Sequence, residues 1–393
     1  MSITSQIYFC GIPFRLDTSP TCAFGCRYCF RTHRGGNNSV HSSLASVSRL
    51  AKKLTRAAIR EPHARDAVEE LLVRRVPIHF GGLSDPFCDE TTSTLSIAVL
   101  RELAGSNQPT VLCTKNLPRL IHDDALSVLN RFKSLVIQTS FSCFSKNTAR
   151  ILEPYAPSPN ERLLAMQFLS SNGFIVTARC QPVFMSLVPE ISGDLIPSIA
   201  VAGANHVSVE YLKLPVERSG RNCLASLPTP LATDVANAAD GSHLRIGREL
   251  LLPSTTRWDL SQPIIAAIRG EGMTYGAADY GLYHLGDTHC CCGLSKMPGF
   301  ENYFRANITT AIRRRHSESI IFDTISKYWT PSKSVRRYFN STSRRPGAST
   351  VKDFLLAKWN RPGTANAPDQ YLGVQFSGDR DSHGNCIYFF QPG

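Results

Sequence analysis

The chain has 393 residues, of which 42% are hydrophobic and 19% charged, and these values are typical of a globular protein and exclude a disordered one. No apolar run approaches the roughly 18 residues of a membrane-spanning helix, and the first ten residues lack the segments of a secretory signal. The cysteine count of 13 is odd, which argues against a disulfide framework and for a reducing compartment. We therefore expect a cytoplasmic protein with no membrane partner. The net charge of +12 favours a polyanionic partner, with nucleic acid the first candidate, although a basic soluble protein without such a partner has the same composition.

Strand and helix patterns alternate along the first 240 residues. Short apolar runs predict the strands, and apolar residues at helical spacing predict the helices between them. The predicted strands are 13–18, 78–80, 111–114, 135–142, 174–182 and 206–212, and the predicted helices are 42–59, 67–73, 94–103, 125–132, 159–171 and 195–202. This order predicts parallel βαβ units, whose reactive groups gather at the carboxyl ends of the strands. Six strand–helix steps are too few for a barrel of eight, so the predicted fold class is α/β, a partial (β/α)6 barrel with a C-terminal extension.

The alternation fades after about residue 240, which predicts a barrel over 1–240 and a basic, cysteine-containing region over 241–393 that packs on or beside it. Arginines become dense in this second region, with aromatic residues between them; they stand at 313–315 and at Arg336, Arg337, Arg344 and Arg345. This composition suits a DNA or RNA surface, because arginine neutralises phosphate and aromatic rings stack on bases. A solvated helix face at 313–315, followed by a flexible loop, is the alternative. Residues 370–376 and 386–390 predict a β-hairpin.

Three cysteines near the start, Cys22, Cys26 and Cys29, have the spacing CxxxCxxC, and Tyr28 directly precedes the last of them. Thiolates on one short loop are the usual ligands of an iron–sulfur cluster. Three of them hold three irons of a [4Fe–4S] cube and leave the fourth iron open to the amino and carboxylate groups of S-adenosylmethionine. The alternative is a structural zinc site, which needs four ligands and would recruit His33, but no second cysteine pair with zinc-site spacing is present in the sequence.

These cysteines and several later segments resemble the radical S-adenosylmethionine superfamily, and within it the spore photoproduct lyase-like group, also labelled DNA repair photolyase. The resemblance covers roughly residues 8–215 and includes Gly81-Gly82-Leu83-Ser84-Asp85-Pro86, Thr114-Lys115-Asn116, 138–142, Leu152-Glu153-Pro154 and 157–162. It implies electron delivery to a cluster, cleavage of S-adenosylmethionine, and a 5′-deoxyadenosyl radical that abstracts hydrogen from substrate. The electron donor implied is a protein such as flavodoxin or ferredoxin.

The resemblance also implies which residues bind S-adenosylmethionine, most of them at strand ends. Glycines there let backbone carbonyls approach a ligand closely, the Ser-Asp pair orients the amino group, and the lysine pairs with the carboxylate. The implied cofactor-binding residues are Tyr28, Gly81, Gly82, Ser84, Asp85, Lys115, Ser140, Ser142, Arg179 and Gln181. Glu153 and Arg162, in contrast, are expected to form a helix-capping ion pair and nothing more.

One position departs from the group's pattern. Two residues before its Ser-Asp pair, spore photoproduct lyase has a cysteine that returns a hydrogen atom to the product, whereas this chain has Gly82. Cys88 is a nearby thiol that could replace it. We therefore do not assign spore photoproduct lyase activity to the chain.

A second cysteine group, His289-Cys290-Cys291-Cys292-Gly293, lies in the C-terminal region. Cys290 and Cys291 are candidate catalytic hydrogen donors, and Tyr280 is a candidate radical relay, because 277–280 also resembles the group's pattern. An auxiliary metal or cluster on two of the cysteines, with His289 or His284, is a second interpretation. A buried cysteine-rich turn is the third, because free cysteine packs like a small apolar residue.

The sequence therefore predicts a radical S-adenosylmethionine enzyme with a [4Fe–4S] cluster, acting on nucleic acid or a nucleotide in repair or modification. The same chemistry on a peptide, a protein or a small metabolite is the first alternative. A zinc-stabilised nucleic-acid-binding protein is the second, and it belongs to a different class.

Overall fold

The computed structural model describes residues 1–4, 10–29, 46–217, 224, 226–239, 244–246, 249–305, 307–315, 318–326, 350–364 and 367–390. The arginines predicted to contact nucleic acid at 336, 337, 344 and 345, and the alternative zinc ligand His33, lie outside these residues. Within the described part of the chain, no helix is both long enough and apolar enough to cross a membrane.

The main sheet has eight strands in the order β1-β2-β3-β4-β5-β6-β7-β11. They are β1 (Ser2–Ile3), β2 (Phe14–Leu16), β3 (Ile78–Phe80), β4 (Thr110–Cys113), β5 (Leu135–Phe141), β6 (Ile175–Val183), β7 (His206–Tyr211) and β11 (Thr274–Ala277). Strands β2 to β7 and β11 run parallel, and β1 pairs antiparallel with β2. The predicted α/β class and its six parallel strands are confirmed. The main sheet extends across the predicted boundary at residue 240, because its last strand, β11, lies after that residue in the sequence.

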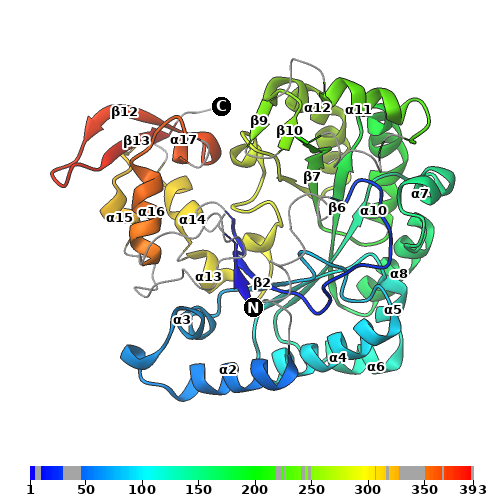
Figure 1. Ribbon diagram of the computed structural model, residues 1–393, viewed down its shortest axis with the longest axis horizontal. Helices are drawn as coiled ribbons and strands as arrows, with labels where there is room; N and C mark the ends of the chain where they lie inside the picture. Colours follow the sequence, from blue (N-terminus) through cyan, green and yellow to red (C-terminus); the bar gives the residue numbers. More distant parts are fainter. Residues whose placement is uncertain are drawn as a thin grey trace.

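Helices between the strands cover the outer face of this sheet, and Figure 1 shows them following one another from α2 and α4 through α8 and α10 to α12. They are α2 (Val47–Ile59), α3 (Ala67–Val73), α4 (Glu90–Gly105), α5 (Leu117–Leu120), α6 (Asp123–Leu129), α7 (Lys146–Leu152), α8 (Pro159–Ser171), α9 (Val188–Glu190), α10 (Ile196–Val201), α11 (Leu231–Ala239) and α12 (Ser254–Gly270). Local sequence sets their ends. Ser158 and Glu161 form a capping box at the start of α8, and Gly173, with a φ of 84°, follows its end.

The inner face of the sheet follows from the two-residue period of a strand. Phe14 and Leu16 on β2 are buried in the main apolar core, whereas Arg15 between them lines an internal cavity. On β3, His79 likewise lines the cavity between two core residues. Deeper on the inner face, Val111 and Val136 pack against apolar residues of the segment 290–304. The chain after β11 therefore fills one end of the half-barrel and leaves the other end open.

The C-terminal elements form a smaller unit on the side away from α8 and α10 (Figure 1). They are α13 (Glu301–Arg305), α14 (Ile308–Arg313), α15 (Phe322–Ser326), α16 (Val351–Trp359), α17 (Pro368–Tyr371) and the paired strands β12 (Val374–Arg380) and β13 (Cys386–Phe390). Trp359 stacks edge-to-face on Phe322 and Tyr388, and its Nε1 donates to the Cys386 carbonyl at 2.6 Å. The predicted hairpin is confirmed, although β12 begins later because α17 occupies 368–371. A separate sheet of β8 (Leu214–Pro215), β10 (Glu249–Leu251) and β9 (Leu244–Ile246) lies between β7 and α12 in sequence.

Candidate functional site

A cavity of about 290 Å³ lies at the carboxyl ends of the parallel strands. The cysteine loop forms one part of its wall, residues at or after the ends of β3 to β7 form much of the rest, and residues of β2 and of the chain after β11 complete it. Every residue that the sequence nominated for the site lines this cavity, with the exception of Ser142, Cys290 and Tyr280. The placement agrees with the rule that reactive groups collect at this edge of a parallel α/β barrel.

Cys22, Cys26 and Cys29 all face the cavity, and the backbone N–H of Cys29 donates to the Cys26 carbonyl at 3.1 Å, which closes a tight turn between them. The thiol of Cys88 lies beside Cys22 and lowers the pKa of Cys22 to about 7, whereas burial raises the pKa of Cys26 to about 12. In the described residues, no three or more His, Cys, Asp or Glu side chains are grouped closely enough to hold a metal ion. Four-iron clusters bind each thiolate to a different iron, so their ligands need to share a cavity rather than a single ion.

The cysteine loop is docked on the chain that follows α7. Arg27 N–H donates to the Leu152 carbonyl at 2.9 Å, and Tyr155 N–H donates to the Phe24 carbonyl at 3.3 Å. Gly25 has a φ of 60°, and a Cβ there would lie 3.2 Å from the Tyr155 ring. Residues 152–155 thus act as the platform that fixes the loop relative to the sheet.

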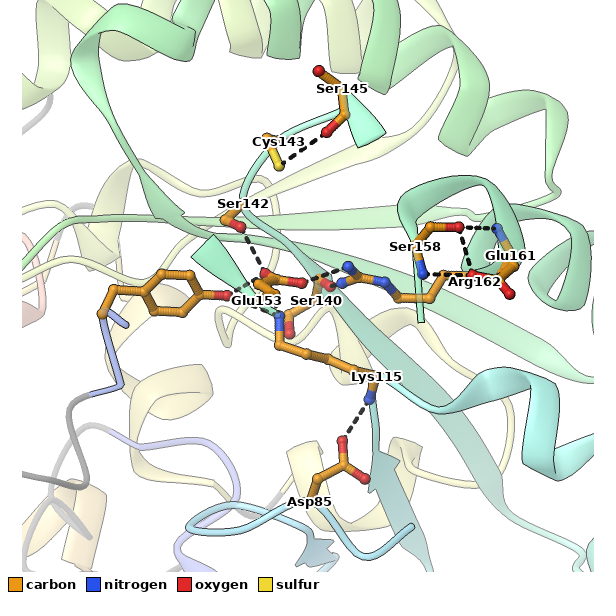
Figure 2. Close-up of polar contacts among 11 residues, drawn as sticks. Asp85, Lys115, Ser140, Ser142, Cys143, Ser145, Glu153, Ser158, Glu161 and Arg162 are labelled. Atoms are coloured by element: carbon orange, nitrogen blue, oxygen red, sulfur yellow. Dashed lines mark hydrogen bonds and ion pairs between the residues drawn. The ribbon is translucent and has the colours of Figure 1, made fainter. Parts of the chain in front are cut away.

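Glu153 in this platform binds four side chains from different elements, as Figure 2 shows for the labelled ones. Its Oε1 accepts from Lys115 Nζ at 2.7 Å, from Ser142 Oγ at 2.6 Å and from the Tyr28 hydroxyl. Its Oε2 accepts from Arg162 Nη2 at 2.5 Å. Burial opposes ionisation, but Arg162 and Lys115 outweigh it and hold the pKa of Glu153 well below its ordinary value. One buried carboxylate therefore joins the cysteine loop to β4, β5 and α8.

The expectation that Glu153 and Arg162 only cap a helix is wrong. The ion pair exists, but both residues are buried, and Arg162 also donates to the Ser140 carbonyl at 2.5 Å beside the cavity. Ser142, expected to bind the cofactor, is likewise buried and donates its hydroxyl to Glu153. The contact between Glu153 and the cysteine loop could have been suspected from the sequence, because the Leu-Glu-Pro segment and the cysteine motif both belong to the family resemblance.

The loop after β3 is held in shape by its own polar groups. Asp85 accepts from the N–H of Phe87 and of Lys115 and from the Thr114 hydroxyl, the last at 2.7 Å, while Ser84 Oγ donates to the Ser19 carbonyl. Gly81 has a φ of 89°, and a Cβ there would collide with the carbonyl oxygen of Cys113. These residues place the loop backbone at the cavity wall.

The second cysteine group does not converge on one point. Cys290 packs in the inner apolar cluster near Phe304, Cys292 is buried in the same cluster, and Cys291 lines the cavity. The buried-turn interpretation therefore describes Cys290 and Cys292, and among the three only Cys291 faces the cavity. Tyr280 lies outside the cavity, where its hydroxyl donates to Gln370 Oε1 at 3.0 Å.

Arg313 does not belong to a nucleic-acid surface or a solvated helix face. Its guanidinium donates to the backbone carbonyls of Tyr283, His284, Gly286 and Thr288, which ties α14 to the chain after β11. Arg315 pairs with Glu318 at 2.6 Å, and Arg314 is exposed. Only Arg314 of this triplet thus matches either expectation.

Sequence reasoning missed several residues of the inner wall, chiefly Arg15, His79 and Cys113. His79 Nε2 lies 2.8 Å from the Cys113 thiol, and that thiol lies 3.4 Å from Gln138 Oε1. The signal was present in the strand pattern, because Arg15 and His79 are each the single polar residue between two large apolar ones. A polar residue in that position points away from the core, and here the other face is the cavity.

The residues present fit the predicted cluster and S-adenosylmethionine in chemical type. Three thiols of one loop face the cavity, and buried polar atoms on its wall lack hydrogen-bond partners, among them Thr139 Oγ1 and the Arg179 Nε. Buried polar groups normally have partners, so the wall retains capacity for a polar ligand.

Searches for similar proteins found no matching family model and no matching curated protein. Among solved structures, 27 chains match. A spore photoproduct lyase mutant with bound AdoMet and dinucleoside spore photoproduct is 11% identical, with a TM-score of 0.49 over 67% of this chain and 76% of the other. Streptococcus suis SuiB bound to precursor peptide SuiA is 12% identical, with a TM-score of 0.44 over 71% and 52%, and SuiB bound to S-adenosylmethionine is 12% identical, with a TM-score of 0.42. Similarity at this level does not show a function, which must be argued from the site.

Proposed function

We propose that this protein is a radical S-adenosylmethionine enzyme that acts on nucleic acid or a nucleotide. The observation that carries the proposal is the convergence, in one cavity, of the three cysteines of a single loop with the polar ends of the parallel strands. A bound [4Fe–4S] cluster and S-adenosylmethionine would supply the electron transfer and the hydrogen-abstracting radical. Cys22, Cys26 and Cys29 would hold the cluster.

The protein's own residues have three tasks in this proposal. Glu153 fixes the cysteine loop through Tyr28 and brings Lys115 to the same wall. Lys115 remains a candidate carboxylate partner, because Glu153 carries one negative charge between two cations. The chain at Arg179 and Gln181 closes the opposite wall and, with Ser140, excludes water from the space between them.

Anaerobic reconstitution with iron and sulfide tests the proposed chemistry. We expect a brown protein with about four irons per chain that forms 5′-deoxyadenosine when S-adenosylmethionine and dithionite are added. Flavodoxin or ferredoxin should replace dithionite as electron donor. A colourless protein that takes up zinc instead of iron would overturn the enzyme and support the zinc-stabilised alternative.

The substrate class is the finer part of the proposal, and it rests on the net charge of +12. We expect binding to DNA or RNA that weakens steeply as salt rises. Deuterium transfer from a labelled nucleic acid or nucleotide into 5′-deoxyadenosine would identify the substrate. Absence of both effects, with cleavage of S-adenosylmethionine intact, would favour a peptide, protein or small-metabolite substrate.

Of the two candidate hydrogen donors, Cys290 and Cys291, we favour Cys291, because it lines the cavity and Cys290 does not. Burial and the neighbouring Cys292 thiol raise the pKa of Cys291 well above its ordinary value, so its S–H is retained at neutral pH. Cys291→Ser should change the fate of the substrate radical without lowering the rate of S-adenosylmethionine cleavage. Cys290→Ser is the matched control, because that side chain packs outside the cavity.

A further inference from the structure

A second polar group lies on the inner wall of the cavity, and Arg179 is the one member of it that was also assigned to cofactor binding. It consists of Arg15 on β2, His79 on β3, Cys113 on β4 and Arg179 on β6, and all four line the cavity. Arg15 and His79 are direct partners in the β2–β3 register. We call these four residues the floor.

The floor carries positive charge that the protein only partly neutralises. Among the described residues, no carboxylate lies within ion-pair distance of Arg15, and the nearby Asp17 gives its Oδ1 to the N–H groups of Leu83 and Ser84. Arg179 lies 3.7 Å from Glu210, and that carboxylate is also bound by Lys213 and Gln181. Arg179 therefore shares its carboxylate with two other side chains, and Arg15 has no ion pair among the described residues.

Three polar atoms of the floor are buried and have no hydrogen-bond partner among the residues that the structure describes: Arg15 Nε, Arg179 Nε and His79 Nδ1. His79 is only 4% exposed, so solvent does not satisfy its ring. Burial, with Arg15 and Arg179 nearby, holds the pKa of His79 well below its ordinary value, and the ring is neutral. The Cys113 thiol donates to Gln138 Oε1, so Nε2 of the neutral ring donates to the Cys113 sulfur, and Nδ1 is an acceptor that faces the cavity.

Gly82 makes room for this arrangement. A Cβ at position 82 would lie 2.8 Å from Arg15 Nη1 and 3.2 Å from His79 Nδ1, so both side chains approach the same point. The cysteine that the related group has at this position would push the guanidinium aside. The departure from the family pattern thus coincides with a cationic group that occupies the vacated space.

We propose that the floor is a subsite for an anionic group of the substrate, a phosphate or a carboxylate, bound by Arg15 and Arg179 beside the neutral ring of His79. Arginine suits this task because its planar N–H groups match both anions, and a water-excluded site strengthens each bond. That the molecule bearing this anionic group is the substrate rests on the proposed function, whereas the binding of an anion at the floor does not.

Calorimetric titration of the full chain, before and after cluster reconstitution, tests the subsite with inorganic phosphate and with acetate at constant ionic strength. We expect one anion to bind at a single site, and Arg15→Gln and Arg179→Gln each to weaken it by about tenfold or more. Stronger binding of phosphate indicates a phosphate-bearing substrate, and stronger binding of acetate indicates a carboxylate. Arg101→Gln, an exposed arginine on α4, is the matched control and should change nothing.

Gly82→Ala provides a second variant that leaves the fold intact, because its backbone is not left-handed and the nearest atom is the mobile end of Arg15. It should also weaken the anion while preserving the thermal unfolding midpoint. Absence of binding by either anion, or equal effects of Arg15→Gln and Arg101→Gln, would overturn the subsite. Displacement of phosphate by S-adenosylmethionine in the reconstituted protein would assign the floor to the cofactor's carboxylate and overturn the substrate role. Binding by the cluster-free chain distinguishes failure of the radical chemistry from failure of the subsite.

Discussion

Replacing Glu153 with glutamine tests whether one buried carboxylate holds the cysteine loop and the end of β4 together. The substitution keeps the shape of the side chain but removes the charge that faces Arg162 at 2.5 Å and Lys115 at 2.7 Å. Because Arg162 is buried, its guanidinium would remain in the interior without a counter-ion. Removing one partner of such a pair costs about 3–5 kcal/mol, and we expect E153Q to lower the free energy of unfolding by that amount.

Urea denaturation followed by circular dichroism measures this loss, which should appear as a lower midpoint with an unchanged slope. Glu61→Gln, an exposed carboxylate with no side-chain cap bond, is the matched control and should stay within about 0.5 kcal/mol of wild type. The iron content after reconstitution is the second readout, and E153Q should hold less iron because Tyr28 loses its anionic partner. A loss below about 1 kcal/mol together with full iron content would refute the role of Glu153.

The loss of stability caused by E153Q also depends on pH, and the ion pairs of Glu153 determine whether this loss grows or shrinks as the pH falls. The pKa of Glu153 is lower in the folded protein than its ordinary value of 4.5, because Arg162 and Lys115 outweigh burial. Such a group stabilises the fold above its unfolded pKa, and this contribution is lost as the pH falls toward the folded pKa. The stability difference between wild type and E153Q should be constant near pH 7 and shrink by about 1.4 kcal/mol per pH unit below pH 4.5. Equal differences at pH 7 and pH 3 would contradict the lowered pKa.

Other substitutions test the remaining assignments. Cys22→Ser should lower the iron content after reconstitution while Cys88→Ser leaves it at about four per chain; loss of iron in both would make Cys88 a ligand. Arg313→Gln should lower the free energy of unfolding by about 2–3 kcal/mol, because it leaves four carbonyls without their donor. The control, Arg314→Gln at an exposed position, should change it by less than about 0.5 kcal/mol. If urea denaturation gave similarly small effects for both variants, the internal role of Arg313 would be contradicted. Tyr280→Phe should leave the formation of 5′-deoxyadenosine unchanged, and a large loss would restore the radical-relay interpretation.

The sequence predicted those parts of the fold and site that depend on local patterns. Strands β2 to β7 could be predicted because each is a short apolar run between helical segments, and α3 and α8 have the predicted bounds. The cysteine loop could be predicted because its three cysteines lie within eight residues of one another. In each case the determining interactions are close in sequence, so composition and spacing are sufficient.

The parts that were missed depend on contacts between distant segments. Glu153 is 125 residues from Tyr28 and 38 from Lys115, and its position beside α7 and α8 made a helix cap the simpler interpretation. Arg313 binds carbonyls 25 to 30 residues earlier, a role that a run of three arginines does not reveal. Strand β11 was missed because the small sheet β8-β10-β9 and two helices interrupt the alternation before it.

The cavity therefore has two zones that differ in how much the sequence motifs explain. The upper zone, formed by the cysteine loop, Lys115 and the loop after β3, consists of residues that the family resemblance implied. Three of the four floor residues lie outside those implied residues, the exception being Arg179, and the floor meets the upper zone at Gly82, the position where the group that the sequence resembles has a cysteine. A Cβ at position 82 would lie 2.8 Å from Arg15 Nη1, so a side chain there requires the guanidinium to shift. The absence of a thiol at this position and the placement of the Arg15 guanidinium are thus linked through one space, so the identity of residue 82 bears on what the floor can bind.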